Sequence, residues 1–499
     1  MSSPVTGTAT DQAPPGLQRT PPSTGFMGHP PGLGLLFVAE MWERFSYYGM
    51  RALLVLYLVN SVGWGDARAA NLYGTYTMLV YLTPLIGGYL ADRLIGTRRS
   101  LVIGGVLIAA GHFTLAFPSM GMFYAGLGLV IIGTGFFKPN VSTMVGQLYE
   151  EGDQRRDSGF TIFYMGINVG AFLGAIICGW LGQKVGWHWG FGAAGVGMVL
   201  GLIVYLALRE KYLPGIGLVP AKTGSAVEVP GSSVADVAKQ GWVPGAAGAA
   251  IGVVLGWMVG GTLGVIMGAA IGASLAITIL GSHGEERKRV IALFIVVFFV
   301  IFFWAAFEQA GSSMNLFADR QTDRVVAGWE VPSTWFQSVN PLLIIIFAAP
   351  FAMLWSKLGR VGKEPSTPLK MALGLFLLGS GFLFMVAGAK LADAGDLVSP
   401  FWLVAAYTFH TWGELCLSPV GLSYVTKVAP WQFASLLMGV WFLANAAANK
   451  IAGSLAAMLE TIPSLTDFYT IFVVSSFAAG VVMLMLVPLL KRLTRTVKM

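Results

Sequence analysis

Long apolar segments run through the whole chain, and they limit its possible folds more than any other feature of the sequence. Fourteen predominantly apolar segments of about 18 or more residues lie near 33–60, 70–92, 100–117, 120–147, 159–181, 188–208, 243–259, 262–281, 288–315, 333–356, 368–392, 398–425, 432–458 and 468–490. Each can cross a bilayer as a helix, and none shows the alternation of a lipid-facing strand. Only 11% of the residues are charged, against about a quarter in soluble domains. The sequence therefore predicts an all-α polytopic membrane protein with 14 transmembrane helices.

The basic residues indicate the orientation of these helices. Of 31 Lys and Arg residues, 22 fall on the side of the N-terminus and four fall within helices. The five on the opposite side are Arg68, Lys184, Arg320, Arg324 and Lys390. Because cytoplasmic loops are enriched in Lys and Arg, we expect both termini in the cytoplasm and the chain in a plasma membrane, such as a bacterial inner membrane. The net charge of +7 fits this topology and anionic lipids, without a nucleic-acid partner.

Polar segments divide the chain into parts. Residues 1–32 are rich in Pro, Gly, Ser and Thr, lack the features of a secretory signal, and predict a disordered cytoplasmic tail. A second polar segment, 211–242, predicts a cytoplasmic linker between a six-helix bundle at 33–210 and an inserted hairpin at 243–281. A second six-helix bundle then spans 282–499. Two six-helix halves are typical of secondary transporters.

The inserted hairpin has a pattern of its own. Glycine recurs every fourth residue from Gly248 to Gly272, and no charged residue occurs between Gly241 and Gly281. Small residues at this spacing allow helices to approach closely, whereas nothing in the segment could orient a polar solute. We therefore expect a tightly packed lateral helix pair rather than a substrate site.

Eight ionisable residues fall at membrane depth, four acids and four bases: Glu40, Glu43, Glu308, Glu414, Arg44, Arg51, Lys138 and Lys450. A charge in hydrocarbon costs at least ~2.5–3.5 kcal/mol, so these groups must pair with one another or face a water-filled cavity. Equal numbers of both signs favour a pathway that binds zwitterions.

The first helix carries half of these charges on one face. Glu40, Glu43, Arg44, Tyr47, Tyr48 and Arg51 follow steps of three and four and project into the same interior. Glu40 and Arg44 can satisfy each other, but Arg51 has no partner on its own helix. At 1.5 Å per residue, Arg51 and Glu308 lie at similar depths, ~27 and ~30 Å along their helices. We therefore expect a charge pair that joins the halves on the outer side and acts as a gate.

Several segments resemble a known family. Residues Glu40–Gly49 match the ExxERFxYYG signature of the proton-dependent oligopeptide transporters, a branch of the major facilitator superfamily. Gly135–Asn140, Phe163–Asn168 and Gly413–Pro419 resemble further segments of this family, in the right order, and the inserted hairpin is similar to that of its bacterial members.

The loop at Gly88–Arg99 resembles the cytoplasmic loop motif of the superfamily, in which an acid and neighbouring bases brace one conformation. This gives Asp92 and Arg93 a gating role. Plain enrichment of cytoplasmic loops in basic residues explains Arg98 and Arg99 without such a role.

The resemblance implies the major facilitator fold and import of di- and tripeptides driven by the proton gradient. It implies that Arg51 and Lys138, with Tyr48 and Asn168 nearby, hold the peptide carboxylate. It further implies that Glu414, with Asn340, faces the peptide ammonium. The pockets for varied side chains are then lined by Trp304, Trp441, Tyr47, Tyr81, Phe307 and Ser418.

Proton coupling is expected to rest on carboxylates. Animal relatives carry a histidine in the second helix, but none of the five histidines here lies in 70–92. We therefore assign coupling to Glu40 and Glu43 with Arg44, and to Glu308. The resemblance gives Lys450 no role: its ammonium either extends to the outer surface or pairs across a cavity.

Other functions fit the sequence less well. A channel needs rings of like charge or a carbonyl filter, and an intramembrane enzyme needs a nucleophile or metal cluster, neither of which the sequence contains. We expect no cofactor and no metal, and a chain that functions as a monomer. The main alternative is the same fold carrying nitrate or another small organic anion, for which the deep carboxylate of Glu414 has no use.

Overall fold

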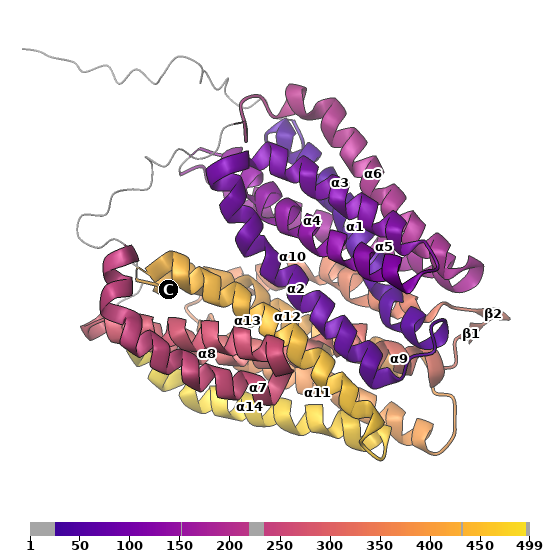
Figure 1. Cartoon of the computed structure of the whole chain (residues 1–499). Helices are drawn as coiled ribbons and strands as arrows, with labels where there is room; N and C mark the ends of the chain where they lie inside the picture. Colours follow the sequence, from indigo (N-terminus) through magenta and orange to yellow (C-terminus); the bar gives the residue numbers. More distant parts are fainter. Residues whose placement is uncertain (1–24, 151, 219–233, 431–432, 496–499) are drawn as a thin grey trace, which may run out of the picture.

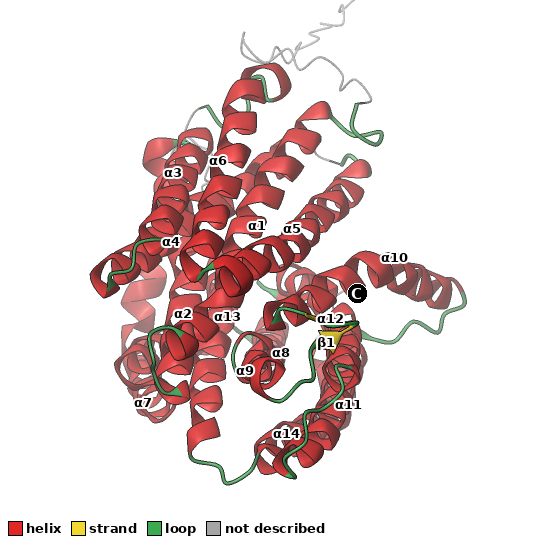
Figure 2. Ribbon diagram, turned by 90° about the vertical axis from the view of Figure 1, so that its right-hand side faces the viewer, coloured by secondary structure: helices red, strands yellow, loops and turns green. Residues whose placement is uncertain are grey.

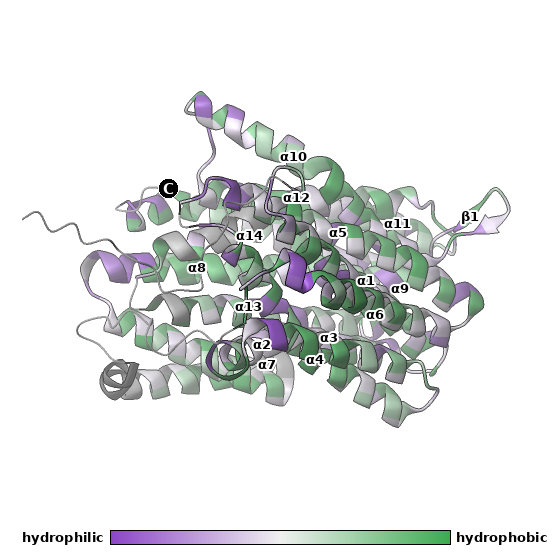
Figure 3. Cartoon of the chain, turned by 90° about the horizontal axis from the view of Figure 1, so that it is seen from above, coloured by the Kyte–Doolittle hydropathy of each residue, from purple (hydrophilic) through white to green (hydrophobic). Residues whose placement is uncertain are grey.

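The structure is a computed structural model that describes residues 25–150, 152–218, 234–430 and 433–495, most of them helical. The predicted fold class, an all-α polytopic membrane protein, is confirmed. By length and composition, nine helical stretches of the described residues can each cross a membrane. Helices suit this setting because every backbone group is satisfied within the segment. Hydrophobic residues dominate the helices, and strongly hydrophilic ones gather at helix ends and in loops (Figure 3).

The N-terminal half consists of six long helices. They are α1 (Pro31–Asn60), α2 (Asp66–Leu90), α3 (Thr97–Leu115), α4 (Met120–Gln147), α5 (Arg155–Trp180) and α6 (Trp187–Tyr212). Short π-helical turns, η1 (Ala91–Ile95) and η2 (Leu181–Val185), extend α2 and α5. Close contacts at small residues bring the helices together: a Cβ on Gly104 of α3 would lie 2.6 Å from the Gly133 carbonyl of α4.

The inserted hairpin is the element α7 (Val234–Gly281), which contains two helices that meet at a kink at Gly261. It packs on α8 and α13, and its Met267 joins a small hydrophobic cluster with Met78 of α2 and Ala446 of α13. In Figure 2, α7 lies on the side of the molecule formed by α2 and α13. Residues 1–24 of the expected tail, 1–32, and residues 219–233 of the expected linker, 211–242, lie outside the described residues. Of the remaining linker residues, 211–212 belong to the end of α6 and 234–242 to the start of α7.

The described residues of the C-terminal half form six long helical segments. The first begins as α8 (Gly284–Phe307) and continues through the 3-10 turn η3 (Glu308–Gly311) into α9 (Ser313–Arg320). A two-stranded hairpin follows, in which β1 (Val325–Val326) pairs antiparallel with β2 (Trp329–Glu330) before the 3-10 turn η4 (Ser333–Ser338). The remaining elements are α10 (Val339–Arg360), α11 (Thr367–Asp393), α12 (Phe401–Val428), α13 (Ala434–Ala457), η6 (Met458–Glu460) and α14 (Leu465–Leu493).

One segment differs from its prediction. The sequence favours a continuous helix over 288–315, but α8 ends at Phe307 and the chain turns through η3. Ser312, with φ −127° and ψ −93°, separates this turn from α9. The break lies where the two halves meet, because Gly311 packs against the Tyr73 hydroxyl of α2.

The two halves form bundles that meet along α2 and α13 and along α5 and α10 (Figure 1). Each half has its own hydrophobic core, one built from α8 and α11 to α14 and the others from α1 to α6. We call the side on which α1 ends and α2 begins the outer side, following the orientation expected from the basic residues. Between the two bundles lies a cavity whose walls come from both halves.

Candidate substrate cavity between the two halves

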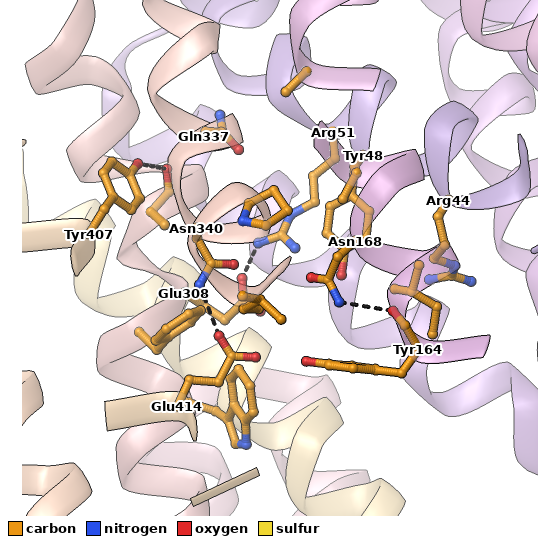
Figure 4. Close-up of a pocket in the computed structure, with 18 of the residues that line it drawn as sticks. Arg44, Tyr48, Arg51, Tyr164, Asn168, Glu308, Gln337, Asn340, Tyr407 and Glu414 are labelled. Carbon is orange, nitrogen blue, oxygen red and sulfur yellow. Dashed lines mark hydrogen bonds and ion pairs between the residues drawn. The ribbon is translucent and has the colours of Figure 1, made fainter. Parts of the chain in front are cut away.

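The cavity has a volume of about 270 Å³ and is lined by charged residues of both signs. The charged members of the lining are Glu40, Arg44, Arg51, Lys138, Glu308 and Glu414. The first four come from α1 and α4 of the N-terminal half, and the other two from η3 and α12 of the C-terminal half. Figure 4 shows Arg44 and Arg51 of the N-terminal half and Glu308 and Glu414 of the C-terminal half around this space. The cavity can thus present opposite charges to one small ligand.

Helix α1 supplies a compact charged group at one end of the cavity. Arg44 lies between two carboxylates: its Nε is 3.0 Å from Glu40 Oε1, and it also forms an ion pair with Glu43. All three side chains are buried, but only Glu40 and Arg44 line the cavity. Two carboxylates therefore share one guanidinium, so the group contains two acids and one base.

Arg51, two turns further along α1, reaches the other half of the protein. Its guanidinium forms an ion pair with Glu308, and the two side chains are only 8% and 7% exposed. Arg51 Nε also donates a hydrogen bond to the hydroxyl of Tyr73 in α2. Gly311 makes room for this arrangement, because a Cβ at that position would collide with the Tyr73 hydroxyl. The pair is thus held from both halves and sits on the outer side of the cavity.

Lys138 brings a second cation to the cavity from α4. Its Nζ lies 4.3 Å from the centre of the Tyr81 ring, a cation–π contact. Within the described part of the chain, the Lys138 ammonium forms no hydrogen bond and no ion pair. Asn168 of α5 lines the same wall and donates a hydrogen bond of 3.0 Å to the Tyr164 carbonyl. Lys138 is therefore a cation available to an anionic group of a ligand.

The opposite wall carries a carboxylate with a polar neighbour. Glu414 of α12 accepts a hydrogen bond of 2.9 Å from the Asn340 side chain of α10, which also donates to Thr411 at 3.0 Å. Glu414 is 6% exposed, and none of the ion pairs in the described residues includes it. Next to it, Trp304 and Phe307 of α8 meet edge to face, with ring centres 5.1 Å apart. This wall combines one anion with aromatic surface.

Most of the site residues expected from the sequence line this one cavity. They are Glu40, Arg44, Tyr48, Arg51, Tyr81, Lys138, Asn168, Trp304, Phe307, Glu308, Asn340 and Glu414. Their assembly follows from the fold, because α1, α4, α5, α8, α10 and α12 all contribute to the interface between the halves.

Other expected site residues lie elsewhere. Glu43 is buried behind Arg44, and Tyr47 packs against Tyr76 with ring centres 6.5 Å apart rather than lining the cavity. Trp441 is buried in the hydrophobic core of the C-terminal half and does not line the cavity either. The side chain of Ser418 lies outside the described part of the chain.

Asp92 and Arg93, expected to take part in gating, are exposed in the turn η1 after α2. The Arg93 guanidinium lies over the Tyr89 ring of the same half, 4.7 Å from its centre. Among the described residues, no ion pair joins Asp92 or Arg93 to the C-terminal half.

The structure adds residues that the sequence did not single out. Tyr164, Gln337 and Tyr407 line the cavity, and the Tyr164 side chain points toward Glu414 (Figure 4). Tyr73 holds Arg51 from α2 without lining the cavity. Tyr164 lies within a segment that carries the family resemblance, and that was the one signal available. Gln337 lies within the predicted helix 333–356, whose first residues form the 3-10 turn η4 instead, and nothing in the sequence marked it as a cavity residue.

Polar contacts between the halves concentrate on the outer side. Arg320 of α9 binds Asp66 at the start of α2 through two hydrogen bonds of 2.6 and 2.8 Å. Lys184 after α5 pairs with Glu330 of β2 at 2.6 Å. This hydrogen bond from Lys184 lowers the pKa of the Glu330 carboxyl. Because Glu330 is exposed, water screens the interaction and weakens it. These contacts and the Arg51–Glu308 pair join the two halves on the outer side of the cavity.

Within the described residues, no cluster of three or more His, Cys, Asp or Glu side chains has an arrangement that could hold a metal ion. The charged groups of the cavity instead form opposed cations and anions, an arrangement that binds and orients a zwitterion without covalent chemistry.

The chain is similar to known proteins both in sequence and in structure. The sequence model of the POT family matches residues 98–214 and 267–489. The chain is 37% identical to the peptide transporter YePEPT of Yersinia enterocolitica, over 96% of this chain and 98% of that protein. It is 35% identical to a di-/tripeptide transporter of Lactococcus lactis subsp. cremoris, over 93% of this chain and 97% of that protein. Its structure resembles a crystal structure of a POT peptide transporter in complex with sulfate, with a TM-score of 0.80 and 40% identity over 95% of this chain and 97% of the other.

Proposed function

Because this chain belongs to the POT family, we propose that it is a proton-coupled symporter that imports di- and tripeptides by alternating access between its two halves. Relatives named as peptide and di-/tripeptide transporters match the chain over nearly its full length. The protein is a multi-pass membrane transporter and not an enzyme.

The observation that carries the proposal is the opposed pair of Lys138 and Glu414. One is a cation without an ion-pair partner in the described residues, and the other is a carboxylate held by Asn340, and they line the same cavity from different halves. Every unmodified di- or tripeptide ends in one ammonium and one carboxylate, while its side chains vary. A fixed cation and a fixed anion with aromatic walls between them therefore recognise the class rather than one member.

Proton coupling is proposed to rest on buried carboxylates that have few cationic partners. We assign it to Glu40 and Glu43, which share Arg44, and to Glu308, whose only ion-pair partner in the described residues is Arg51. Protonation of Glu308 removes the charge that holds Arg51. Arg51 then becomes free to bind a peptide carboxylate, which ties proton binding to substrate binding.

The conformation supports alternating access with the outer side closed. The proposed orientation puts both termini in the cytoplasm of a bacterial cell, with the protein in the inner membrane. In that orientation the pairs Arg51–Glu308, Arg320–Asp66 and Lys184–Glu330 close the cavity to the exterior. We assign Asp92 and Arg93 to the opposite conformation, in which the cytoplasmic side closes. Because one chain supplies both walls of the cavity, we propose that a monomer is the functional unit.

A competition assay in proteoliposomes tests the proposal. Uptake of a labelled dipeptide is measured with an inward-directed proton gradient, in the presence of excess dialanine, trialanine, alanine or nitrate. Dialanine and trialanine should compete, whereas alanine and nitrate should not, and collapse of the gradient should abolish accumulation. Competition by nitrate alone would show an anion carrier on the same fold, which the Glu414 carboxylate argues against.

A further inference from the structure

Lys450 lies on the seam where α2 and α13 join the two halves, and the proposed transport cycle gives it no role. Its Nζ donates hydrogen bonds to Thr75 Oγ1 at 3.1 Å and to Asn71 Oδ1 at 3.4 Å, both on α2. The Lys450 side chain is half-buried. Within the described residues no carboxylate pairs with it, so both of its partners are neutral.

The backbones of α2 and α13 touch one turn from Lys450. Gly74 of α2 faces Gly453 of α13, where a Cβ on Gly74 would lie 2.8 Å from the Gly453 Cα and a Cβ on Gly453 would lie 2.7 Å from the Gly74 Cα. Contacts of this kind form only when two helices approach fully, and they are lost when the helices separate slightly. The bonds from Lys450 to α2 therefore depend on a closed seam.

We propose that Lys450 is a reversible latch of this outer seam. When the seam is closed, its ammonium binds Thr75 and Asn71 and holds α13 against α2. When the outer side opens, the same ammonium leaves both oxygens and faces water. The latch acts between the helices and touches neither the peptide nor the proton site.

A cation with neutral partners explains why such a latch can release. The ammonium has three N–H donors, and the seam offers it two neutral oxygens. Partial removal of the ammonium from water costs free energy, which these two bonds offset. The Arg51–Glu308 pair differs, because there two opposite charges neutralise each other in a buried site. Lys450 therefore stabilises the closed seam only weakly, so the contact can break when the outer side opens.

This balance between the burial cost and the hydrogen bonds predicts which of two substitutions opens the seam further. Thr75→Val keeps the shape of the side chain but leaves the half-buried ammonium short of an acceptor, which penalises the closed seam. Lys450→Met removes the ammonium together with its hydrogen bonds. The cost of taking the charge out of water and the stabilisation by the two hydrogen bonds therefore disappear together. The Thr75→Val change should therefore open the seam further than Lys450→Met does.

Spin labels on the outer loops can report the separation of the two halves. Ser61, after α1, and Thr461, after α13, are exposed on the outer side and belong to different halves. Both are changed to cysteine in a background in which the native Cys178 and Cys416, both buried, are replaced by alanine. The distance distribution between the two labels, measured by pulsed electron paramagnetic resonance in lipid nanodiscs, gives the ratio of separated to joined outer ends. The measurement needs no substrate, so it is independent of whether the chain carries peptides.

We expect Thr75→Val to raise the ratio of separated to joined ends about tenfold, and Lys450→Met to change it less than about threefold. Adding Lys450→Met to Thr75→Val should return the ratio toward that of Lys450→Met alone, because the two changes act on one contact. Additive effects of the two substitutions, or no effect of Thr75→Val, would refute the latch.

Two further variants complete the experiment. Lys390→Met removes a charge from the exposed outer end of α11 and should leave the distances unchanged. Gly453→Ala places a Cβ 2.6 Å from the Ala70 carbonyl, so it should force the seam apart and supply the reference distance for separated ends. An increase with Lys390→Met as large as that with Thr75→Val would show that outer charge in general, and not the contact of Lys450, sets the distance.

Discussion

Replacement of Glu308 by glutamine should move the protein toward the conformation that is open on the outer side. Glutamine keeps the shape of the side chain and one acceptor oxygen, but it removes the charge that binds Arg51. Hydrogen bonds that involve charged groups contribute about 1.5–3 kcal/mol and neutral ones about 0.5–1.5 kcal/mol, so the closed state loses about 1.5 kcal/mol. Because the two side chains are 8% and 7% exposed, water screens little of this difference. The ratio of outer-open to outer-closed protein should therefore rise about tenfold.

Labelling of single cysteines with a water-soluble maleimide measures this shift. Ser338 of η4 is buried on the outer side of the cavity, and Ser142 of α4 lies one turn beyond Lys138 toward the expected cytoplasmic side. Each is changed to cysteine in the background without native cysteines. At neutral pH, Glu308→Gln should speed labelling at position 338 and slow it at position 142.

A matched variant separates the buried pair from outer contacts in general. Glu460 also joins the halves, since its Oε1 accepts a hydrogen bond of 2.8 Å from the Ala67 backbone, but it is exposed. Exposed charged contacts contribute little, so Glu460→Gln should leave both labelling rates unchanged. If Glu308 only stabilises the fold, Glu308→Gln will lower the melting temperature and leave labelling on both sides at the parent rates. That outcome would refute the gate.

Three further substitutions test binding polarity and coupling. Glu414→Gln should weaken uptake of peptides with a free amino terminus by about 10- to 100-fold while affecting N-blocked analogues little, because a charge-assisted contact contributes about 1.5–3 kcal/mol; equal losses for both ligands in a transport assay would remove Glu414 from recognition of the ammonium. Glu40→Gln and Glu43→Gln should each abolish accumulation driven by a pH gradient but spare peptide counterflow, since exchange needs no net proton movement. Accumulation at the parent level in both variants would leave these carboxylates as structural partners of Arg44.

Much of the site follows from the cost of placing charge in a membrane. Arg51 has no partner on its own helix, and its depth along α1 matches that of Glu308 on the first helix of the other half. A constant rise per residue makes such depths readable from sequence, and the structure brings these two side chains into contact. The role of this contact in gating stays a prediction.

Rotation of the helices could not be read in the same way. Tyr47 and Tyr48 are neighbours, about 100° apart around α1, and only Tyr48 lines the cavity. The rotation of α1 is fixed by contacts with α5, where a Cβ on Gly174 would collide with the Phe45 carbonyl. Such a contact depends on which helices meet, and the residue pattern of a single helix does not show this. Trp441 was misplaced for the same reason, because an aromatic residue at mid-helix packs equally well in a core.

The sequence also did not reveal some polar contacts of the site. Tyr73 is one of 15 tyrosines, and nothing around it in the sequence marks it as the acceptor for Arg51. Its role depends on Gly311, which lies in a break that interrupts an apolar segment with no proline to signal it. The break brings Glu308 to the meeting point of the halves, so the tertiary contact rather than local preference sets the end of α8.

Arg51 cannot bind Glu308 and a peptide carboxylate in the same way at the same time, and this gives Lys138 a distinct task. In the conformation with the outer side closed, Arg51 is occupied, whereas Lys138 faces the cavity with no ion-pair partner in the described residues. We therefore expect Lys138 to hold the peptide carboxylate in this conformation. Lys138→Gln should weaken binding of a dipeptide to purified protein by about 10- to 100-fold, since one charge-assisted contact is lost.

A dipeptide with an amidated carboxyl end provides the control for Lys138. It lacks the charge that Lys138 attracts, so calorimetry should find nearly equal affinities of the parent protein and of Lys138→Gln for this ligand. Equal losses for the free and the amidated dipeptide would mean that Lys138 shapes the cavity without binding the carboxylate. If the loss is confined to the free acid, the carboxylate must pass from Arg51 to Lys138 as Glu308 reclaims its partner, so that closing the outer gate and moving the substrate toward the cytoplasm become one event.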